Sequence, residues 1–209
     1  MSALAPIPIY LASTSRYRHE LLQRLGIPFE ALAPKVDETP LPHEAPRDLA
    51  LRLAIAKAEA IAASRTHGLV IGSDQVAHCE GSKLDKSGTH EVATGQLRFM
   101  RGKTVHFDTA LALVNAATGR VQSDIVSIVV RMHDLTDDQI DAYLRAEQPY
   151  DCAGSAKSEG LGIALMQTLS GDDPTALIGL PLIALTRMLR AEGVDPLLLA
   201  RPLPGAAAA

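Results

Sequence analysis

A short apolar run, a turn of small polar residues and an amphipathic helix follow one another near the start of this 209-residue chain. Residues 7–12 predict a strand, and residues 15–25 predict a helix that carries Arg18 and stops at Gly26. Backbone amides at such a turn and the positive end of the helix dipole favour an anion, which an arginine binds with two hydrogen bonds. The segment therefore predicts a phosphate site. The alternative is that Ser13 or Ser15 only caps the helix and Arg18 lies in solvent.

The composition limits the classes of protein that the chain can represent. A formal net charge of −4 argues against a broad surface for nucleic acid or anionic membrane, which leaves small molecules as the expected partners. No apolar run reaches the roughly 18 residues of a membrane-spanning helix, and residues 1–9 lack the pattern of a signal peptide. Cys79 and Cys152 have no metal-ligand spacing and are expected to be reduced packing residues. We therefore expect a cytoplasmic protein.

Strand and helix signals alternate along the chain, which predicts an α/β fold. The length suits one domain over residues 1–209, with two lobes and loose ends at about 1–6 and 200–209. The other predicted elements, in chain order, are a strand at 29–32, a proline-rich loop at 34–46, a helix at 46–63, a strand at 68–72, a hairpin of 104–114 and 121–132, a helix at 137–146 and a closing helix ending near 191.

Several ionisable residues fall near the ends of these elements. Asp74 directly follows the strand at 68–72, where an open α/β sheet places its site, so it is a candidate metal ligand or general base; a turn aspartate is the alternative. Lys57 is expected on the more polar side of its helix, and Lys86 in a polar loop. Asp172 and Asp173 are expected in a solvated turn that caps the next element, in preference to a metal site.

The order of these motifs resembles the Maf family of nucleotide pyrophosphatases, over about residues 9–193. The resemblance implies an α/β protein with a mixed, bent sheet in two lobes around a central cleft, similar to inosine-triphosphatase-type enzymes and commonly a homodimer. The segments that carry the resemblance are Leu11-Ala12-Ser13-Thr14-Ser15 with Arg18, Val36-Asp37-Glu38, Ala56-Lys57-Ala58, Ile71-Gly72-Ser73-Asp74-Gln75-Val76, Lys86, Cys152-Ala153-Gly154-Ser155, Lys157-Ser158-Glu159-Gly160 and Gly179-Leu180-Pro181.

The resemblance also implies an activity, which is hydrolysis of a nucleoside triphosphate between the α and β phosphates to a monophosphate and pyrophosphate. Mg²⁺ or Mn²⁺ is the implied cofactor, with Glu38 and Asp74 as its ligands, and Asp74 is the implied proton acceptor for the attacking water. The implied triphosphate-binding residues are Ser13, Ser15, Arg18, Lys57 and Lys86. Two alternatives stay open. In the first, the chain is a nucleotide-binding regulator of septum formation that does not turn over its ligand. In the second, Lys57 is only a surface lysine and Glu38 only ends a turn.

Three positions favour the branch of the family that hydrolyses 7-methyl-GTP over the branch that takes dTTP and UTP. Tyr17, Gln75 and Glu159 stand where the pyrimidine branch usually has arginine, threonine and glutamine. A tyrosine face attracts the delocalised positive charge of N7-methylguanine, and a carboxylate accepts hydrogen bonds from its N1–H and exocyclic amine. The alternatives are that Tyr17 packs against a neighbouring helix and that Glu159 only pairs with Lys157.

The chain departs from the family pattern at a few positions. Arg16 stands where proline is common and adds positive charge near the implied phosphates, and Ala156 replaces a usual phenylalanine near the implied base pocket. Lys86 usually follows glycine and precedes proline, whereas Asp85 and Ser87 flank it here. We expect the Asp85 carboxylate to weaken the hold of Lys86 on phosphate.

Overall fold

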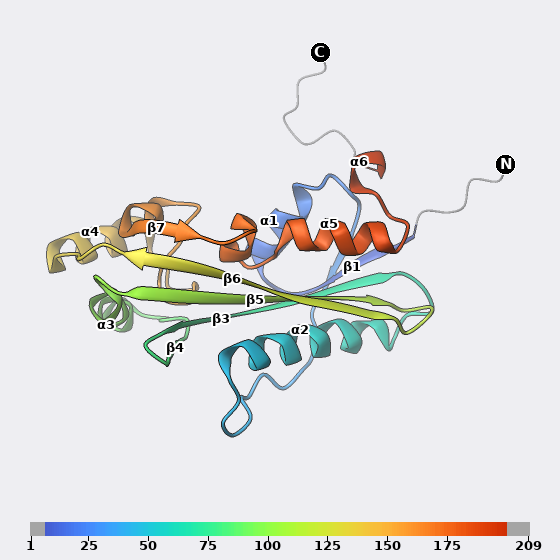
Figure 1. Ribbon diagram of the computed structural model, residues 1–209, viewed down its shortest axis with the longest axis horizontal. Coiled ribbons are helices and arrows are strands. Elements are labelled where there is room, and N and C mark those ends of the chain that lie inside the picture. Colours follow the sequence, from blue (N-terminus) through green and yellow to red (C-terminus); the bar gives the residue numbers. More distant parts are fainter. Residues whose placement is uncertain (1–6, 200–209) are drawn as a thin grey trace, which may run out of the picture.

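The computed structural model describes residues 7–199 and contains a seven-stranded mixed sheet with helices on both faces (Figure 1). The expected loose ends, 1–6 and 200–209, lie outside these residues. The strands are β1 (Ile9–Ala12), β2 (Glu30–Leu32), β3 (Leu69–Cys79), β4 (Ser82–Leu84), β5 (Thr104–Asn115), β6 (Val121–Met132) and β7 (Met166–Ser170). The helices are α1 (Arg16–Gln23), α2 (Pro46–Ala62), α3 (His90–Met100), α4 (Asp137–Glu147), α5 (Leu182–Ala191) and α6 (Pro196–Leu199), with 3-10 turns η1 (Leu161–Leu165) and η2 (Pro174–Ile178).

The predicted alternation of strands and helices is confirmed, and the sheet has the strand order β2-β1-β3-β5-β6-β7 with β4 attached to β3. The strand predicted at 68–72 is much longer, however, because β3 pairs with β5 along its whole length, from Leu69 opposite Asn115 to Cys79 opposite Val105. The prediction that Asp74 follows the strand is therefore wrong. Asp74 lies in the middle of β3, where a continuous backbone ladder holds polar residues in the extended conformation.

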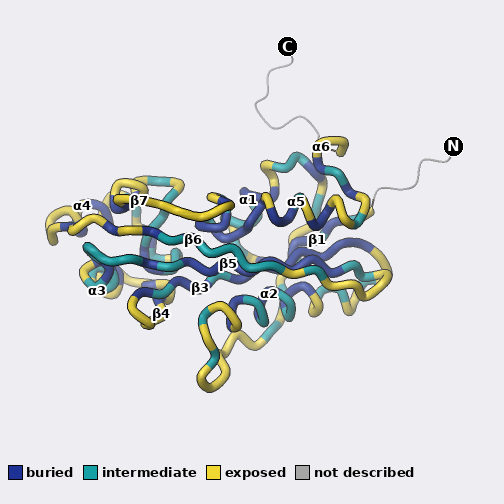
Figure 2. The backbone as a smooth tube through the Cα atoms, in the orientation of Figure 1, coloured by how far each residue is buried: buried dark blue, intermediate teal, exposed yellow. Residues whose placement is uncertain are grey.

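Two groups of helices cover the sheet at its two ends, and this gives the molecule its two lobes (Figure 1). In one lobe, α1 and α5 pack on one face of the sheet and α2 packs on the other. In the other lobe, α3 and α4 pack against the far ends of β3, β5 and β6. Figure 2 shows β3 and β5 as mostly buried along their central parts, which are shared by both lobes, and β6 as mostly intermediate. The predicted mixed sheet in two lobes is confirmed.

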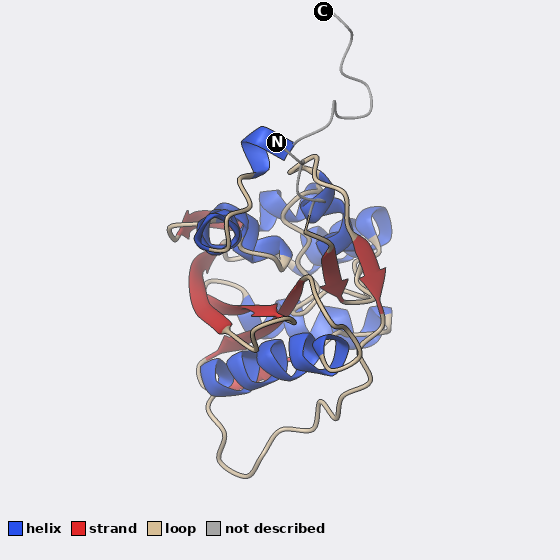
Figure 3. Ribbon diagram, turned by 90° about the vertical axis from the view of Figure 1, so that its right-hand side faces the viewer, coloured by secondary structure: helices blue, strands red, loops and turns tan. Residues whose placement is uncertain are grey.

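One edge of β3 is left open between the two lobes. The parallel strand β1 pairs with β3 only from Leu69 to Ile71, and the antiparallel strand β4 pairs with it only from Ala77 to Cys79. Between them, within residues 7–199, no strand pairs with this edge of β3. Side chains alternate between the two faces of a strand, so side chains from both faces can reach the gap at an open edge. The curvature of the sheet around this region is visible in Figure 3.

No helix within the described residues combines the length and the apolar character needed to cross a membrane.

Candidate active site

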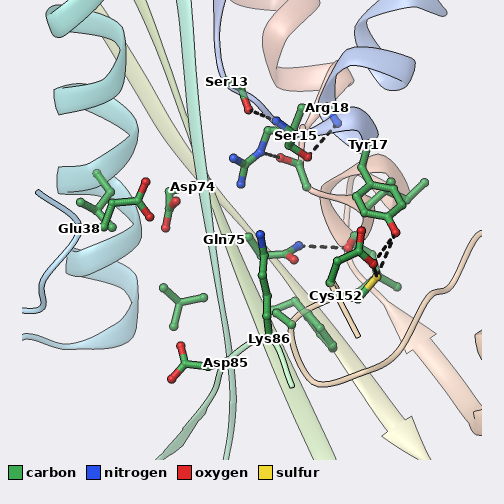
Figure 4. Close-up of a pocket in the computed structure, with 18 of the residues that line it drawn as sticks. Ser13, Ser15, Tyr17, Arg18, Glu38, Asp74, Gln75, Asp85, Lys86 and Cys152 are labelled. Atoms are coloured by element: carbon green, nitrogen blue, oxygen red, sulfur yellow. Dashed lines mark hydrogen bonds between the residues drawn. The ribbon is translucent and has the colours of Figure 1, made fainter. Parts of the chain in front are cut away.

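The gap at the open edge of β3 is the floor of a pocket of about 550 Å³ between the lobes (Figure 4). Its walls come from the turn between β1 and α1, from α2, from the segment after β4 and from the loop before η1. The structure brings all the residues singled out from the sequence to this pocket: Ser13, Ser15, Tyr17, Arg18, Glu38, Lys57, Asp74, Gln75, Lys86 and Glu159.

A lysine and two carboxylates form the centre of one wall. The Nζ atom of Lys57 lies 2.6 Å from Oδ1 of Asp74 and 2.9 Å from Oε1 of Glu38. Only 5% of Lys57 and 9% of Asp74 is exposed to solvent, whereas the Glu38 side chain is 59% exposed. The three groups therefore form a charged cluster with a buried end at Asp74 and an open end at Glu38.

The prediction that Lys57 lies on the polar side of its helix is wrong, because α2 packs so closely on β3 that this side chain faces the sheet. Gly72 permits the approach: a Cβ atom there would lie 2.1 Å from the carbonyl oxygen of Ala54 and 2.8 Å from the amide nitrogen of Ala58. The aliphatic stem of Lys57 packs in this interface and carries its ammonium to Asp74. The alternative that Lys57 is a surface lysine is excluded by its burial.

The turn between β1 and α1 forms a second wall. Ser15 is the N-cap of α1, where its Oγ accepts a hydrogen bond from the Arg18 amide, and Ser13 Oγ accepts one from the Ser15 amide at 3.1 Å. Arg18 does not lie free in solvent, because its Nε donates to the Gly179 carbonyl at 2.9 Å. Burial lowers the pKa of the guanidinium, and the negative charges of Asp74 and Glu38 partly offset this effect. In Figure 4 Arg18 extends into the pocket.

Gln75 points to the opposite face of β3 from Asp74. Its Nε2 donates to the carbonyl oxygens of Ala176 and Leu177, at 2.9 and 3.0 Å, and to Oγ1 of Thr109 at 2.9 Å. Carbonyl oxygens accept hydrogen bonds but cannot donate them, so these contacts fix which end of the amide is nitrogen. Oε1 of Gln75 is then the atom left to receive a hydrogen bond from a ligand.

Tyr17 is held in a polar cluster, not against a neighbouring helix. Its hydroxyl donates to Oδ1 of Asp151 at 3.0 Å and accepts from the guanidinium of Arg16, which also lies over the ring at 4.7 Å from its centroid. Burial raises the pKa of the Tyr17 hydroxyl. Cys152, expected to be a packing residue, lines the pocket with its Sγ 3.5 Å from this hydroxyl, and burial raises its pKa to about 11. Burial therefore favours the protonated form of both groups.

Glu159 does not pair with Lys157, so that alternative is wrong. Lys157 instead contacts Oε1 of Glu147 at 2.5 Å, and Oε2 of Glu147 accepts from the Leu161 amide at 2.7 Å. These contacts anchor the loop on both sides of Glu159 to the end of α4. Within residues 7–199, the Glu159 carboxylate contacts only Ser158 Oγ, at 3.5 Å, so its oxygens are available to a ligand.

Asp85 pairs with a lysine other than Lys86, and the expected weakening of the hold of Lys86 on phosphate stays a prediction. The Asp85 carboxylate lies 2.8 Å from the Nζ of Lys83, which is a pocket residue that sequence analysis did not single out. Lys86 forms a β-bridge with Ala153, which holds its backbone beside the loop at 150–155. The Glu80-Gly81 pair, whose φ angles are both positive, forms the two-residue turn between β3 and β4, and it is the sequence signal that could have placed Lys83 on a hairpin strand.

Asp173 caps the next element as expected, but it is not solvated. Its carboxylate accepts hydrogen bonds from the amides of Thr175 and Ile183, at 3.1 and 2.7 Å, and the residue is only 2% exposed. It therefore ties η2 to the start of α5, and η2 in turn presents the carbonyls that orient Gln75.

The charges that line the pocket balance. Two carboxylates, Glu38 and Asp74, meet at one ammonium, whereas nowhere in residues 7–199 do three or more His, Cys, Asp or Glu side chains form a metal-binding group of their own. Mg²⁺ is commonly held by one or two carboxylates together with water and substrate phosphates, so this donor set fits a metal that arrives with a phosphate. The balanced set consists of Arg16, Arg18, Lys57, Lys83 and Lys86 against Glu38, Asp74, Asp85, Asp151 and Glu159.

A family model described as Maf-like protein matches residues 8–192. The chain belongs to the Maf family. The resemblance drawn from the sequence is thereby confirmed, and the Maf match spans every residue that lines the pocket.

Relatives of this Maf protein include several named 7-methyl-GTP pyrophosphatase. One from a Polaromonas species is 60% identical over 92% of this chain and 89% of its own. One from Burkholderia pseudomallei is 58% identical over 98% and 95%, and one from Bordetella pertussis is 57% identical over 94% and 98%. Among solved structures, the Staphylococcus aureus Ham1 protein aligns with a TM-score of 0.45 and 15% identity, over 61% of this chain and 72% of that one.

Proposed function

We propose that this Maf protein hydrolyses 7-methyl-GTP between the α and β phosphates to 7-methyl-GMP and pyrophosphate. The observation that carries the proposal is that two hydrogen-bond acceptors, on Gln75 and Glu159, line the same pocket. Gln75 presents Oε1 because its nitrogen is already engaged, and Glu159 presents a carboxylate. Guanine offers donors at N1–H and at its exocyclic amine, which match acceptors on the protein. The relatives named 7-methyl-GTP pyrophosphatase support the same choice.

Methylation at N7 gives the base a positive charge, which Glu159 can balance, since Asp151 already pairs with Arg16 at 3.3 Å. The aromatic ring of Tyr17 lies beside Asp151, whose Oδ1 accepts from the Tyr17 hydroxyl. A cation over a tyrosine face gains about 0.5–2 kcal/mol. The Arg16 guanidinium already uses the ring in this way, so we propose that the methylated base stacks on the ring face that Arg16 leaves open, or displaces Arg16. Unmethylated GTP would lack this contribution.

We also propose that the reaction depends on Mg²⁺ or Mn²⁺. A pocket whose five cationic and five anionic side chains balance cannot neutralise a triphosphate unless positive charge arrives with the substrate. Glu38 and Asp74 would hold such an ion, and its role would be to neutralise phosphate charge and polarise the phosphorus.

The other catalytic roles fall to different side chains of the pocket. We propose that Asp74 accepts a proton from the water that attacks the α phosphorus, while the bond to the bridging oxygen breaks and pyrophosphate leaves with its electron pair. Lys57 keeps the Asp74 carboxylate in one orientation through the 2.6 Å contact. Arg18 and Lys86 stabilise the charge that develops on the phosphate oxygens, and the amides near Ser13 and Ser15 bind the same group.

Pyrophosphate release from a panel of 7-methyl-GTP, GTP, dTTP, UTP, CTP and ITP, with Mg²⁺ or Mn²⁺, tests the proposal. We expect the highest kcat/KM for 7-methyl-GTP and no turnover after the metal is chelated. Preference for dTTP and UTP would keep the pyrophosphatase activity but overturn the account of base selection. Binding of nucleotide without turnover would instead favour the regulator.

A further inference from the structure

Lys83 lies on the same side of the sheet as Asp74, farther along the pocket. In the ladder between β3 and β4, Lys83 is opposite His78, and cross-strand neighbours point to the same face. Asp74 and His78 are four residues apart on β3, so they also share a face and are separated by roughly 13 Å along the strand. Both residues line the pocket, so the stretch between their positions offers space for the outer phosphates of a nucleotide.

The partner of Lys83 is an exposed carboxylate on a fixed backbone. Asp85 lies 2.8 Å from Lys83 Nζ, and its side chain is 71% exposed. Its carbonyl oxygen accepts from Gln96 Nε2 at 2.8 Å and from the Gly154 amide at 3.4 Å, so the main chain is anchored while the side chain can turn away. An exposed ion pair of this kind is weak, so a multiply charged anion can readily outcompete it.

We infer that Lys83, together with Lys86, forms a binding site for the leaving pyrophosphate, and that Asp85 is the counter-ion of Lys83 when this site is empty. This inference rests on the proposed function. The β and γ phosphates displace Asp85 from Lys83 when substrate binds, and Asp85 returns to Lys83 when pyrophosphate departs. The monophosphate product does not reach Lys83, because its phosphate lies at Asp74 and Arg18.

Isothermal titration of inorganic pyrophosphate and of 7-methyl-GMP, in separate experiments in magnesium buffer, tests the assignment on three variants. Lys83→Gln should weaken pyrophosphate binding about fivefold or more, and Asp85→Asn should strengthen it by about threefold, since each changes an interaction of roughly 1 kcal/mol. Neither should change the affinity for 7-methyl-GMP. Lys103→Gln is the matched control. The Nζ of Lys103 forms a similar ion pair with Glu80, with a separation of 2.7 Å, and neither residue lines the pocket.

Three results would overturn the inference. The first is no measurable binding of pyrophosphate to the wild type, and the second is equal pyrophosphate affinity in Lys83→Gln and wild type. The third is that Lys83→Gln loses as much affinity for 7-methyl-GMP as for pyrophosphate. The measurement needs no turnover, so it separates the two proposals. If the wild type hydrolysed no nucleotide but bound pyrophosphate in a manner dependent on Lys83, the proposed function would fail and the binding site would stand. If it hydrolysed 7-methyl-GTP while Lys83→Gln bound pyrophosphate normally, only the inference would fail.

Discussion

Lys57 reaches from α2 to Asp74 on β3 across 2.6 Å, and both side chains are almost completely removed from solvent. A lysine buried without a partner is costly, and so is a buried carboxylate, so each residue depends on the other for its place in the fold. The same contact fixes the orientation of the proposed general base. Stability and the proposed catalysis therefore depend on the same pair.

Asp74→Asn should reduce kcat by about 10²–10⁴, because the amide cannot accept the proton of the attacking water. The nucleotide affinity should change by less than about tenfold, since Arg18 and Lys86 still bind the phosphates. Stopped-flow or coupled measurement of pyrophosphate release gives kcat, and titration with nucleotide gives the affinity. Asp172→Asn, in an exposed turn, is the control. An unchanged rate in Asp74→Asn would remove this residue from the mechanism.

Lys57→Met should lower the free energy of unfolding by about 3 kcal/mol, because it leaves the buried Asp74 carboxylate without its counter-ion. Urea unfolding followed by circular dichroism measures the loss. The double variant Lys57→Met with Asp74→Asn should recover part of it, since the unpaired charge is then absent. A single variant as stable as the wild type would contradict the dependence described above.

Glu159→Gln should shift selectivity from 7-methyl-GTP toward UTP. The ratio of the two kcat/KM values should fall by about tenfold or more, because a carboxylate that accepts from guanine and balances the methylated base is replaced by a neutral amide. The Lys157–Glu147 contact is untouched by this change, so the loop should keep its place. Glu91→Gln, in the first turn of α3, should leave the ratio unaltered.

Gly72→Ala should both destabilise the protein and impair hydrolysis. Its Cβ would meet the backbone of α2 at 2.1 Å, so the helix must move outward, at a cost of roughly 3 kcal/mol, and carry Lys57 away from Asp74. Gly95→Ala provides the comparison, because a Cβ there meets nothing within 4 Å and alanine favours a helix. Equal thermal stability of Gly72→Ala and wild type would mean that α2 does not pack on β3 as closely as described.

Glu44→Gln should reduce the amount of folding stability that the protein loses as the pH falls below about 4.5. A hydrogen bond from Arg52 is the main reason that the pKa of Glu44 falls from 4.5 to about 2. The unfolded chain therefore binds more protons than the folded one between these values, and the stabilisation present above pH 4.5 is lost as the pH falls toward 2. Urea midpoints measured at pH 5 and pH 3 should differ less in the variant than in wild type. An equal difference would show that this pair does not govern acid stability.

Local sequence signals predicted the turn between β1 and α1, whereas contacts between segments distant in the sequence place the other elements and residues of the site. The Ser15 cap and the α1 helix follow from neighbouring residues, and the structure has them where expected. Lys57 could not be placed from the sequence, because its burial depends on Gly72 and on the packing of α2 against β3. Strand β7 also has no local pattern, since nearly all its residues are exposed and it exists through pairing with β6.

The residues proposed to recognise the base were found by resemblance, but their orientations depend on the fold. Gln75 owes its direction to two carbonyls of η2, a hundred residues away along the chain. The Glu159 carboxylate is available because Lys157, its partner in the alternative interpretation, forms an ion pair with Glu147. Contacts between distant segments, which no local pattern reveals, determine which atoms of these residues are available to a ligand.

Asp74 and Gln75 are consecutive residues on a strand hydrogen-bonded to β5, and they point to opposite faces. The residue proposed to activate the attacking water and the residue proposed to recognise the base are thus separated by a single peptide unit of a rigid strand, so the distance between them is fixed. A nucleotide whose base and α phosphate are spaced differently cannot contact both residues together, and no loop movement can change this distance. Selectivity in this protein is then a matter of length as well as of hydrogen-bonding pattern.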